Sequence, residues 1–115
     1  MEIRRIGDRI RRAFAGQAWK REDVAFRDRH MALGSSELDY AKARPAYQHG
    51  FEAGIAQANR GRTFEEVEDA LRRVWDAEHA SQSGSWESVR GYVQRAYRRG
   101  QELVDATPQR IDAAT

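Results

Sequence analysis

PAYQHGFEAGIAQANRG, residues 45–61, is the most informative stretch of this chain. Its small residues recur at every fourth position in an unbroken row: Ala46, Gly50, Gly54 and Ala58. Pro45 suits the first turn of a helix, because backbone N–H groups there have no intrahelical partner. We therefore predict a helix over about 45–58 that ends at 59–61. Each glycine costs ~1 kcal/mol of helix propensity relative to alanine, so the row indicates that another helix backbone packs closely against it.

The following helix begins at a recognisable cap. Thr63 and Glu66 form a capping box, in which the hydroxyl and the carboxylate each bind a free backbone N–H group. Apolar residues then recur at helical spacing: Phe64, Val67, Leu71, Val74 and Trp75. We predict a helix over 64 to about 79 and a loop over 81–85, where serines and a glycine cluster.

A last helix is predicted over 86 to about 105, with Ser85 as its cap. Its apolar stripe consists of Trp86, Val89, Val93, Ala96, Tyr97, Gly100, Leu103 and Val104. The pattern A-Y-x-x-G-x-E occurs at 46–52 and again at 96–102. It places aromatic, small and acidic groups identically on two helices, and either a duplication or a shared packing geometry explains it.

The first third of the chain is strongly amphipathic. Apolar residues line one face of residues 1–16 and arginines line the other: Ile3, Ile6, Ile10 and Phe14 against Arg4, Arg5, Arg11 and Arg12. We predict that this cationic helix ends at Gly16 and that a second helix spans about 20–32. The predicted division of the chain is therefore a helix over 1–16, a bundle domain over 17–106 and a frayed tail over 107–115.

These segments together predict an all-α protein. No stretch alternates polar and apolar residues as a half-buried strand does. The chain has 115 residues, the size of one domain, and 18 of its 46 hydrophobic residues are alanine, so the core is thin. We predict a small bundle of four to five helices joined by short loops.

Composition and motifs exclude several classes of protein. The chain has no cysteine, which excludes disulfides, thiolate zinc sites, iron–sulfur clusters and a cysteine nucleophile. No apolar run approaches the ~18–20 residues that span a bilayer, and residues 1–16 lack the apolar core of a secretory signal. We expect a cytoplasmic location. Because no phosphate-binding glycine loop or nucleophile elbow is present, we expect neither enzymatic activity nor a cofactor.

Two pairs of metal-ligand residue types stand at helical spacing, His49 with Glu52 and Asp76 with His79. Residues three apart share a helix face, so two neighbouring helices would bring all four together as a site for zinc, manganese or iron. A chain that is 33% charged produces such spacings by chance. We therefore predict no metal site and keep these four residues as weak candidates.

The helical segments also resemble a known group of domains. The pattern R-P-A-Y-x-x-G lies at 44–50, R-x-[FW]-x-x-x-E at 62–68 and R-x-x-W at 72–75. This combination resembles a group of small bacterial all-helical, stress-associated domains over roughly residues 23–100. Members of this group usually have an aromatic residue at the position of His49, so this chain departs from them there. The resemblance implies a helical fold and a stress-response setting, and it implies no particular activity.

Charge is unevenly distributed along the chain. Residues 1–21 carry seven basic and two acidic groups, a net charge of +5, whereas residues 62–79 carry three basic and six acidic groups, a net charge of −3. This alternation suits self-association, because the basic segment of one copy can face the acidic segment of another. Residues predicted to serve packing or interaction are Tyr47, Gly50, Gly54, Trp75, Trp86 and Tyr97.

Three functions are compatible with these features. The leading hypothesis is a non-enzymatic protein-interaction module that forms homo-oligomers in a stress response. The alternative is sequence-nonspecific nucleic-acid binding by the N-terminal helix, whose candidate contacts are Arg4, Arg5, Arg11 and Arg12. The third is a metal-binding helical protein. We expect no peripheral binding to membranes.

Overall fold

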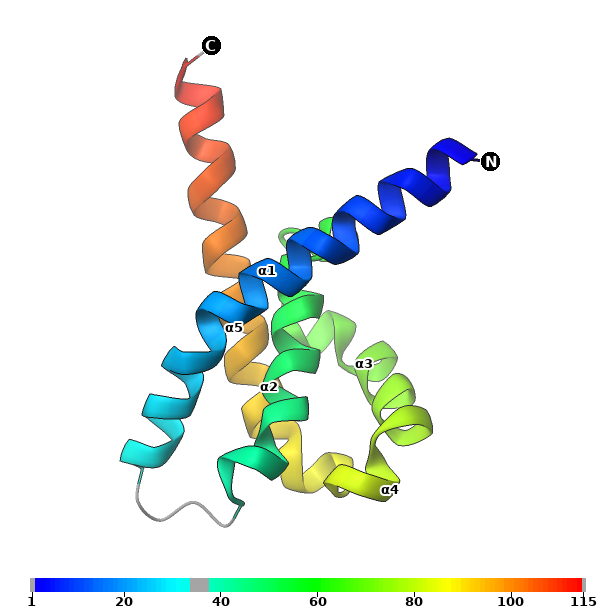
Figure 1. Cartoon of the computed structure of the whole chain (residues 1–115), viewed down its shortest axis with the longest axis vertical. Helices are drawn as coiled ribbons and strands as arrows, with labels where there is room; N and C mark the ends of the chain where they lie inside the picture. The colour runs from blue at the N-terminus through cyan, green and yellow to red at the C-terminus, as the bar shows by residue number, and fades with distance from the viewer. Residues whose placement is uncertain (1, 34–37, 115) are drawn as a thin grey trace.

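Helices account for nearly all of the chain in the computed structural model (Figure 1). The structure describes the backbone of residues 2–33 and 38–114, and the side chains of 16–33 and 38–105. The helices are α1 (Glu2–Ala32), α2 (Tyr40–Ile55), α3 (Phe64–Glu78), α4 (Ala80–Ser83) and α5 (Trp86–Ala114), with a 3-10 turn at Gln57–Asn59. The described residues contain no strand, so the predicted all-α class is confirmed.

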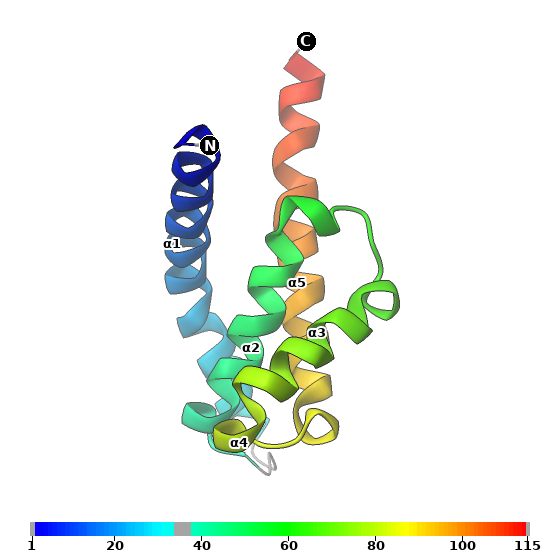
Figure 2. The same ribbon diagram turned by 90° about the vertical axis from the view of Figure 1, so that its right-hand side faces the viewer.

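α2 and α5 lie side by side and meet backbone to backbone (Figure 2). A Cβ atom on Gly100 would lie 2.7 Å from the carbonyl oxygen of Phe51, and one on Gly54 would lie 3.0 Å from the Cα atom of Gly100. At Gly50 an added Cβ would overlap the carbonyl of Val93. The predicted close packing of the small-residue row is therefore confirmed, and it joins the two copies of the A-Y-x-x-G-x-E pattern.

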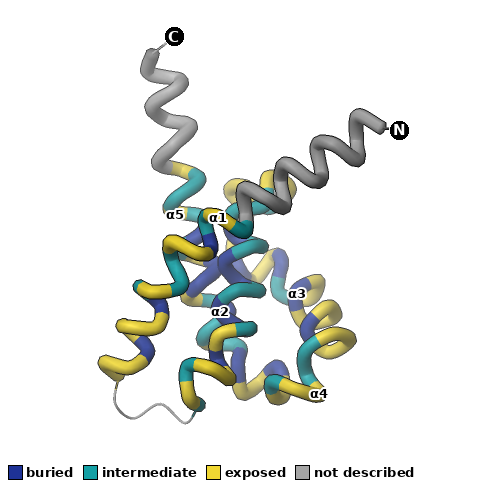
Figure 3. Tube along the Cα trace, viewed as in Figure 1, coloured by how far each residue is buried: buried dark blue, intermediate teal, exposed yellow. Residues whose placement is uncertain are grey.

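Buried residues on the inner faces of α2, α3 and α5 form the larger part of the core (Figure 3). They are Ala46, Phe64, Val67, Leu71, Trp75, Trp86, Val89, Val93 and Tyr97. The indole N–H of Trp75 donates to the carbonyl of Gly84 (2.8 Å), and the hydroxyl of Tyr97 donates to the carbonyl of Arg62 (2.7 Å). These aromatic residues therefore serve packing, with their polar atoms paired.

The start of α3 agrees with the prediction. The Thr63 hydroxyl accepts a hydrogen bond from the backbone N–H of Glu66 (3.3 Å), and the Glu66 carboxylate accepts one from the N–H of Thr63 (3.0 Å). The bonds that the Glu66 carboxylate accepts from the N–H and the hydroxyl of Thr63 lower the pKa of Glu66 below its usual range. The capping box is therefore present as the sequence indicates.

α1 differs from the prediction, because it runs without a break from Glu2 to Ala32. Gly16 lies within this helix and does not end it. The predicted pair of separate helices, over 1–16 and 20–32, was therefore wrong. An isolated glycine weakens a helix by only ~1 kcal/mol. Its neighbours include Ala13, Ala15 and Ala18, which favour the helix, and no proline interrupts it.

Three other predicted helix limits were also wrong. α2 begins at Tyr40 and contains Pro45, whose ring leaves only one intrahelical hydrogen bond unmade while Ala43, Ala46 and Tyr47 are buried. α4 occupies part of the predicted 81–85 loop and ends at Gly84, which has a φ of 101°. The backbone of α5 is helical as far as Ala114, past the predicted helix end near residue 105.

Candidate functional site

An aromatic cluster attaches α1 to the rest of the bundle. Trp19 and Phe26 lie seven residues apart on one face of α1 and are both buried. The ring of Phe26 stacks on Tyr47 of α2, with the centroids 5.1 Å apart, and the ring of Trp19 lies 5.9 Å from that of Phe51. The spacing of the aromatic residues thus determines which face of α1 meets the bundle.

His30 continues this face and is only 3% exposed. Its Nε2 lies 2.5 Å from the carbonyl oxygen of Leu38, and its Nδ1 lies 2.9 Å from the hydroxyl of Tyr47. A carbonyl can only accept, so Nε2 carries a proton and donates to Leu38, while Nδ1 is the hydrogen-bond partner of the Tyr47 hydroxyl. His30 therefore joins α1 to α2 and to the segment before it. Its spacing from Phe26 is the only sequence signal for this role.

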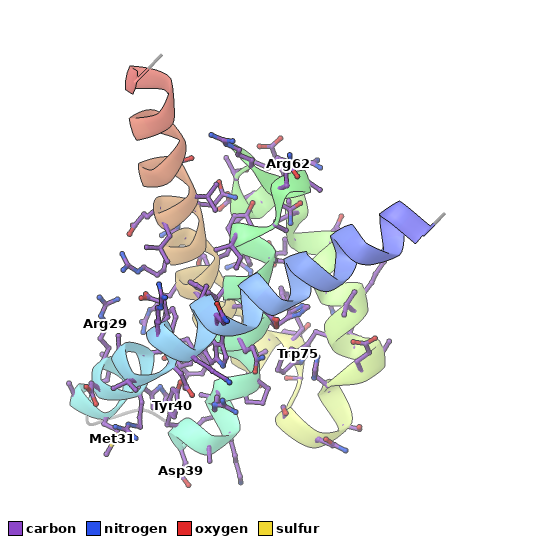
Figure 4. The ribbon with its side chains drawn as sticks, turned by 45° about the horizontal axis from the view of Figure 1, so that its top comes forward. Arg29, Met31, Asp39, Tyr40, Arg62 and Trp75 are labelled. Carbon is purple, nitrogen blue, oxygen red and sulfur yellow. The ribbon has the colours of Figure 1, made fainter. Side chains whose placement is uncertain are left out.

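A pocket of about 380 Å³ opens beside this cluster, between α1 and α5. Apolar side chains that line it are Phe26, Leu33 and Tyr47, beside His30. Its charged side chains are Arg29 from α1 and Arg95, Arg98, Arg99 and Glu102 from α5. The pocket therefore combines apolar and cationic side chains, and Figure 4 labels Arg29 on α1.

Most of the positive charge around the pocket is uncompensated. Arg99 pairs with Glu22 of α1 at 2.6 Å and approaches Glu102 at 3.6 Å. Within the described part of the chain, no carboxylate lies within 4.0 Å of Arg29, Arg95 or Arg98.

Both the burial of Tyr47 and the positive charge beside it affect the pKa of its hydroxyl. Burial raises the pKa of its hydroxyl above the usual range, and the nearby Arg95 guanidinium partly opposes this rise. Guanidinium groups bind carboxylates and phosphates through paired N–H donors. The arrangement can therefore hold an anion against apolar surface. Local sequence does not reveal Arg29, Arg95, Arg98 and Arg99 as one group, because they come from two helices that lie far apart along the chain.

The weak metal candidates do not assemble as a metal site. The rings of His49 and His79 do come together, with centroids 5.7 Å apart, but the Nε2 of His49 donates to the carbonyl of Leu71 (3.0 Å). Asp76 faces Arg72 instead, at 3.5 Å. Burial raises the pKa of Glu52 and lowers that of His49. No group of three or more ligand-type side chains suited to a metal occurs in the described residues.

The other predicted contacts fall in different places. Tyr47, Gly50, Gly54, Trp75, Trp86 and Tyr97 are all buried within the fold. The side chains of Arg4, Arg5, Arg11 and Arg12 lie outside the described residues. Among the helices that the structure describes, none is both long and apolar enough to cross a membrane.

α1 also presents apolar residues to solvent. Val24 is 51% exposed and Met31 is 67% exposed, and Figure 4 shows Met31 pointing away from the other helices. The two residues lie seven positions apart, which brings a helix back to nearly the same side. They stand on a different side of α1 from the buried Trp19 and Phe26.

Comparisons of the chain with known protein families, with curated proteins and with solved structures find no match. The fold therefore defines only a class, a small all-α bundle. Its two distinctive surfaces are the arginine-lined pocket and the exposed apolar face of α1.

Proposed function

We propose that this protein is a non-enzymatic interaction module that associates with a second copy of itself through the outer face of α1. The observation that supports it is the exposure of Val24 and Met31 on a helix whose opposite side already packs on the bundle. Exposed apolar residues aligned on one helix face are typical of an interaction surface. The proposal retains the leading hypothesis from the sequence.

The sequence extends this face toward the N-terminus. Ile3 and Ile10 precede Val24 by 21 and 14 residues, so these residues share one register position in the continuous helix α1. Gln17 takes the same register position between Ile10 and Val24, so the apolar residues form two pairs on either side of it. Apolar residues at seven-residue spacing are the pattern by which helices pair along their length. Burying large apolar side chains contributes ~1.5–3 kcal/mol each, so a few such residues from each copy stabilise a dimer.

Charge favours an antiparallel pairing of the two α1 helices. Residues 1–16 carry five basic and two acidic groups, whereas residues 17–32 carry four basic and three acidic groups. A parallel pair would place the two more basic halves together, and like charges at an interface are unfavourable. In the antiparallel pair, the N-terminal half of α1 in one copy lies along the C-terminal half of α1 in the other, which carries Val24 and Met31.

Sedimentation of the full chain tests self-association. We expect a dimer for the wild type and a folded monomer for the double variant Val24→Glu, Met31→Glu, because both side chains are exposed within a single copy. The matched control is Val74→Glu, which alters an apolar residue of α3 that is 43% exposed and should leave the mass unchanged. A monomeric wild type, or a double variant that remains dimeric, contradicts the proposal.

Nucleic-acid binding by the basic N-terminal segment is the second candidate, and the net charge of +5 over residues 1–21 favours it. Replacing Arg4, Arg5, Arg11 and Arg12 with Gln should then abolish DNA binding and reduce its salt dependence while leaving the fold and the mass unchanged. Loss of self-association without a change in DNA affinity would favour the leading proposal. A stress-response role and a cytoplasmic location remain predictions.

A further inference from the structure

The arginine-lined pocket between α1 and α5 is separate from the outer face of α1 and plays no part in the proposed self-association. We propose that this pocket binds a carboxylate that carries an apolar group, such as a short alkyl acid or the end of a peptide chain. Three features of the pocket lead to this ligand.

Leu33 gives the pocket apolar surface that a ligand can cover. It is nearly half exposed, whereas Phe26 and Tyr47, which line the same space, are almost fully buried. A volume of about 380 Å³ is at the lower end of the range for small-molecule sites. An alkyl or aryl group against Leu33 would remove apolar area from water, which favours binding.

The charged side of the pocket attracts an anion. Arg29 from α1 and Arg95 and Arg98 from α5 line the pocket with no carboxylate partner in the described residues. All three arginines are exposed to solvent, so they bind an anion through paired, charge-assisted N–H donors rather than through burial of charge. Two helices supply the cations, so the anion would also tie α1 to α5.

The acidic groups leave the pocket with a net positive charge. Glu102 lines the pocket, and Glu22 already pairs with the fourth arginine, Arg99. Arg29, Arg95 and Arg98 therefore outnumber Glu102. A carboxylate suits these groups, because a guanidinium pairs with both of its oxygens through parallel N–H donors.

Calorimetric titration of the full chain with octanoate tests the site. We expect one octanoate per chain and binding that is weakened about tenfold or more in the variant Arg95→Gln, Arg98→Gln, because two charge-assisted hydrogen bonds are lost. The matched control is Arg73→Gln, an exposed arginine of α3 outside the pocket, and its affinity should equal that of the wild type.

Related probes separate the features of the ligand. Octanamide has the same alkyl chain without the charge, and acetate has the charge without the chain, so both should bind far more weakly than octanoate. A peptide ending in leucine with a free carboxyl group, compared with its amidated form, shows whether a chain terminus is accepted as well as a free acid. Stronger binding of octyl phosphate would overturn the assignment of a carboxylate.

Two results would overturn the site itself. They are equal binding of octanoate to the wild type and to the Arg95→Gln, Arg98→Gln variant, and equal binding of octanoate and octanamide. The titration is repeated on the variant Val24→Glu, Met31→Glu, whose changes lie outside the pocket. Octanoate binding in that variant therefore tests the pocket whether or not self-association occurs.

Discussion

α5 meets α2 and α1 in opposite ways. Against α2 it places backbone directly on backbone, with Gly50, Gly54 and Gly100 leaving no room for a side chain. Against α1 it places long side chains and, among the described residues, one ion pair between Arg99 and Glu22, beside an open pocket. The glycine contact therefore has no room for a ligand, whereas the contact with α1 has a pocket lined by arginines.

This difference separates stability from binding. Close-packed backbones tolerate almost no change in volume, since any added atom displaces a whole helix. A contact made by arginines and aromatic rings can adjust its side chains around a ligand. We therefore expect substitutions between α2 and α5 to affect mainly the free energy of unfolding, and substitutions between α1 and α5 to affect mainly binding.

The largest effect is expected at Gly50. Gly50→Leu should unfold the protein or lower the free energy of unfolding by ~3 kcal/mol or more, because the added Cβ already overlaps the carbonyl of Val93. Gly50→Ala should also destabilise, and urea unfolding measures both. The control is Gly91→Ala at an exposed position of α5. A Cβ there meets nothing within 4 Å, and the gain in helix propensity is ~1 kcal/mol. If Gly50→Ala stabilised the protein, the close contact between α2 and α5 would be disproved.

A smaller loss is expected where α1 joins α2. Tyr47→Phe removes the partner of the Nδ1 atom of buried His30 and should lower the free energy of unfolding by ~1–3 kcal/mol. Tyr40→Phe is the control, since Asp23 keeps its 3.0 Å ion pair with Arg44 when the Tyr40 hydroxyl is lost. An equal loss in both variants would show that the bond from Tyr47 to His30 has no special role.

The pH dependence of stability should report on His49, between α2 and α3. Burial lowers its pKa below the ordinary 6.5. Between the lowered value and 6.5, the unfolded chain binds more protons than the folded one, so stability falls as the pH drops through this window and is fully present above it. Unfolding free energies measured from about pH 7.5 to 5.5 should show this fall.

His49→Gln tests the assignment of that pH dependence. A glutamine amide can still donate to the carbonyl of Leu71, but it does not titrate. The variant should therefore lose the part of the acid-dependent fall that His49 causes, and its stability above pH 6.5 serves as the reference. An unchanged slope in the variant would assign the pH dependence to other groups.

The smallest effect is expected at the ion pair between α1 and α5. Arg99→Gln should lower the free energy of unfolding by less than ~1 kcal/mol, because the Arg99 side chain is about one-third exposed and water screens the pair with Glu22. Thermal unfolding in low and high salt measures this contribution. A loss as large as that of Tyr47→Phe would mean that charge, rather than the aromatic cluster, holds α1 in place.

The correct predictions from the sequence depended on local interactions. The capping box at Thr63 and Glu66 involves residues three positions apart, and its bonds form within a single turn. The glycine row at Gly50 and Gly54 signals a close neighbour through its loss of helix propensity alone. The errors at Gly16 and Pro45 arose because one unfavourable residue is outweighed by the rest of its helix.

The sequence by itself therefore determined the all-α class, the start of α3 and the need for a backbone partner beside α2. Only the tertiary structure decided which helix that partner is, and where the pocket lies. Arg29 and Arg95 are 66 residues apart in the chain, and nothing in their local sequence relates them. They line one pocket because Phe26 and His30 dock α1 on Tyr47, next to α5. Such a meeting depends on packing between distant segments, which local periodicity does not encode.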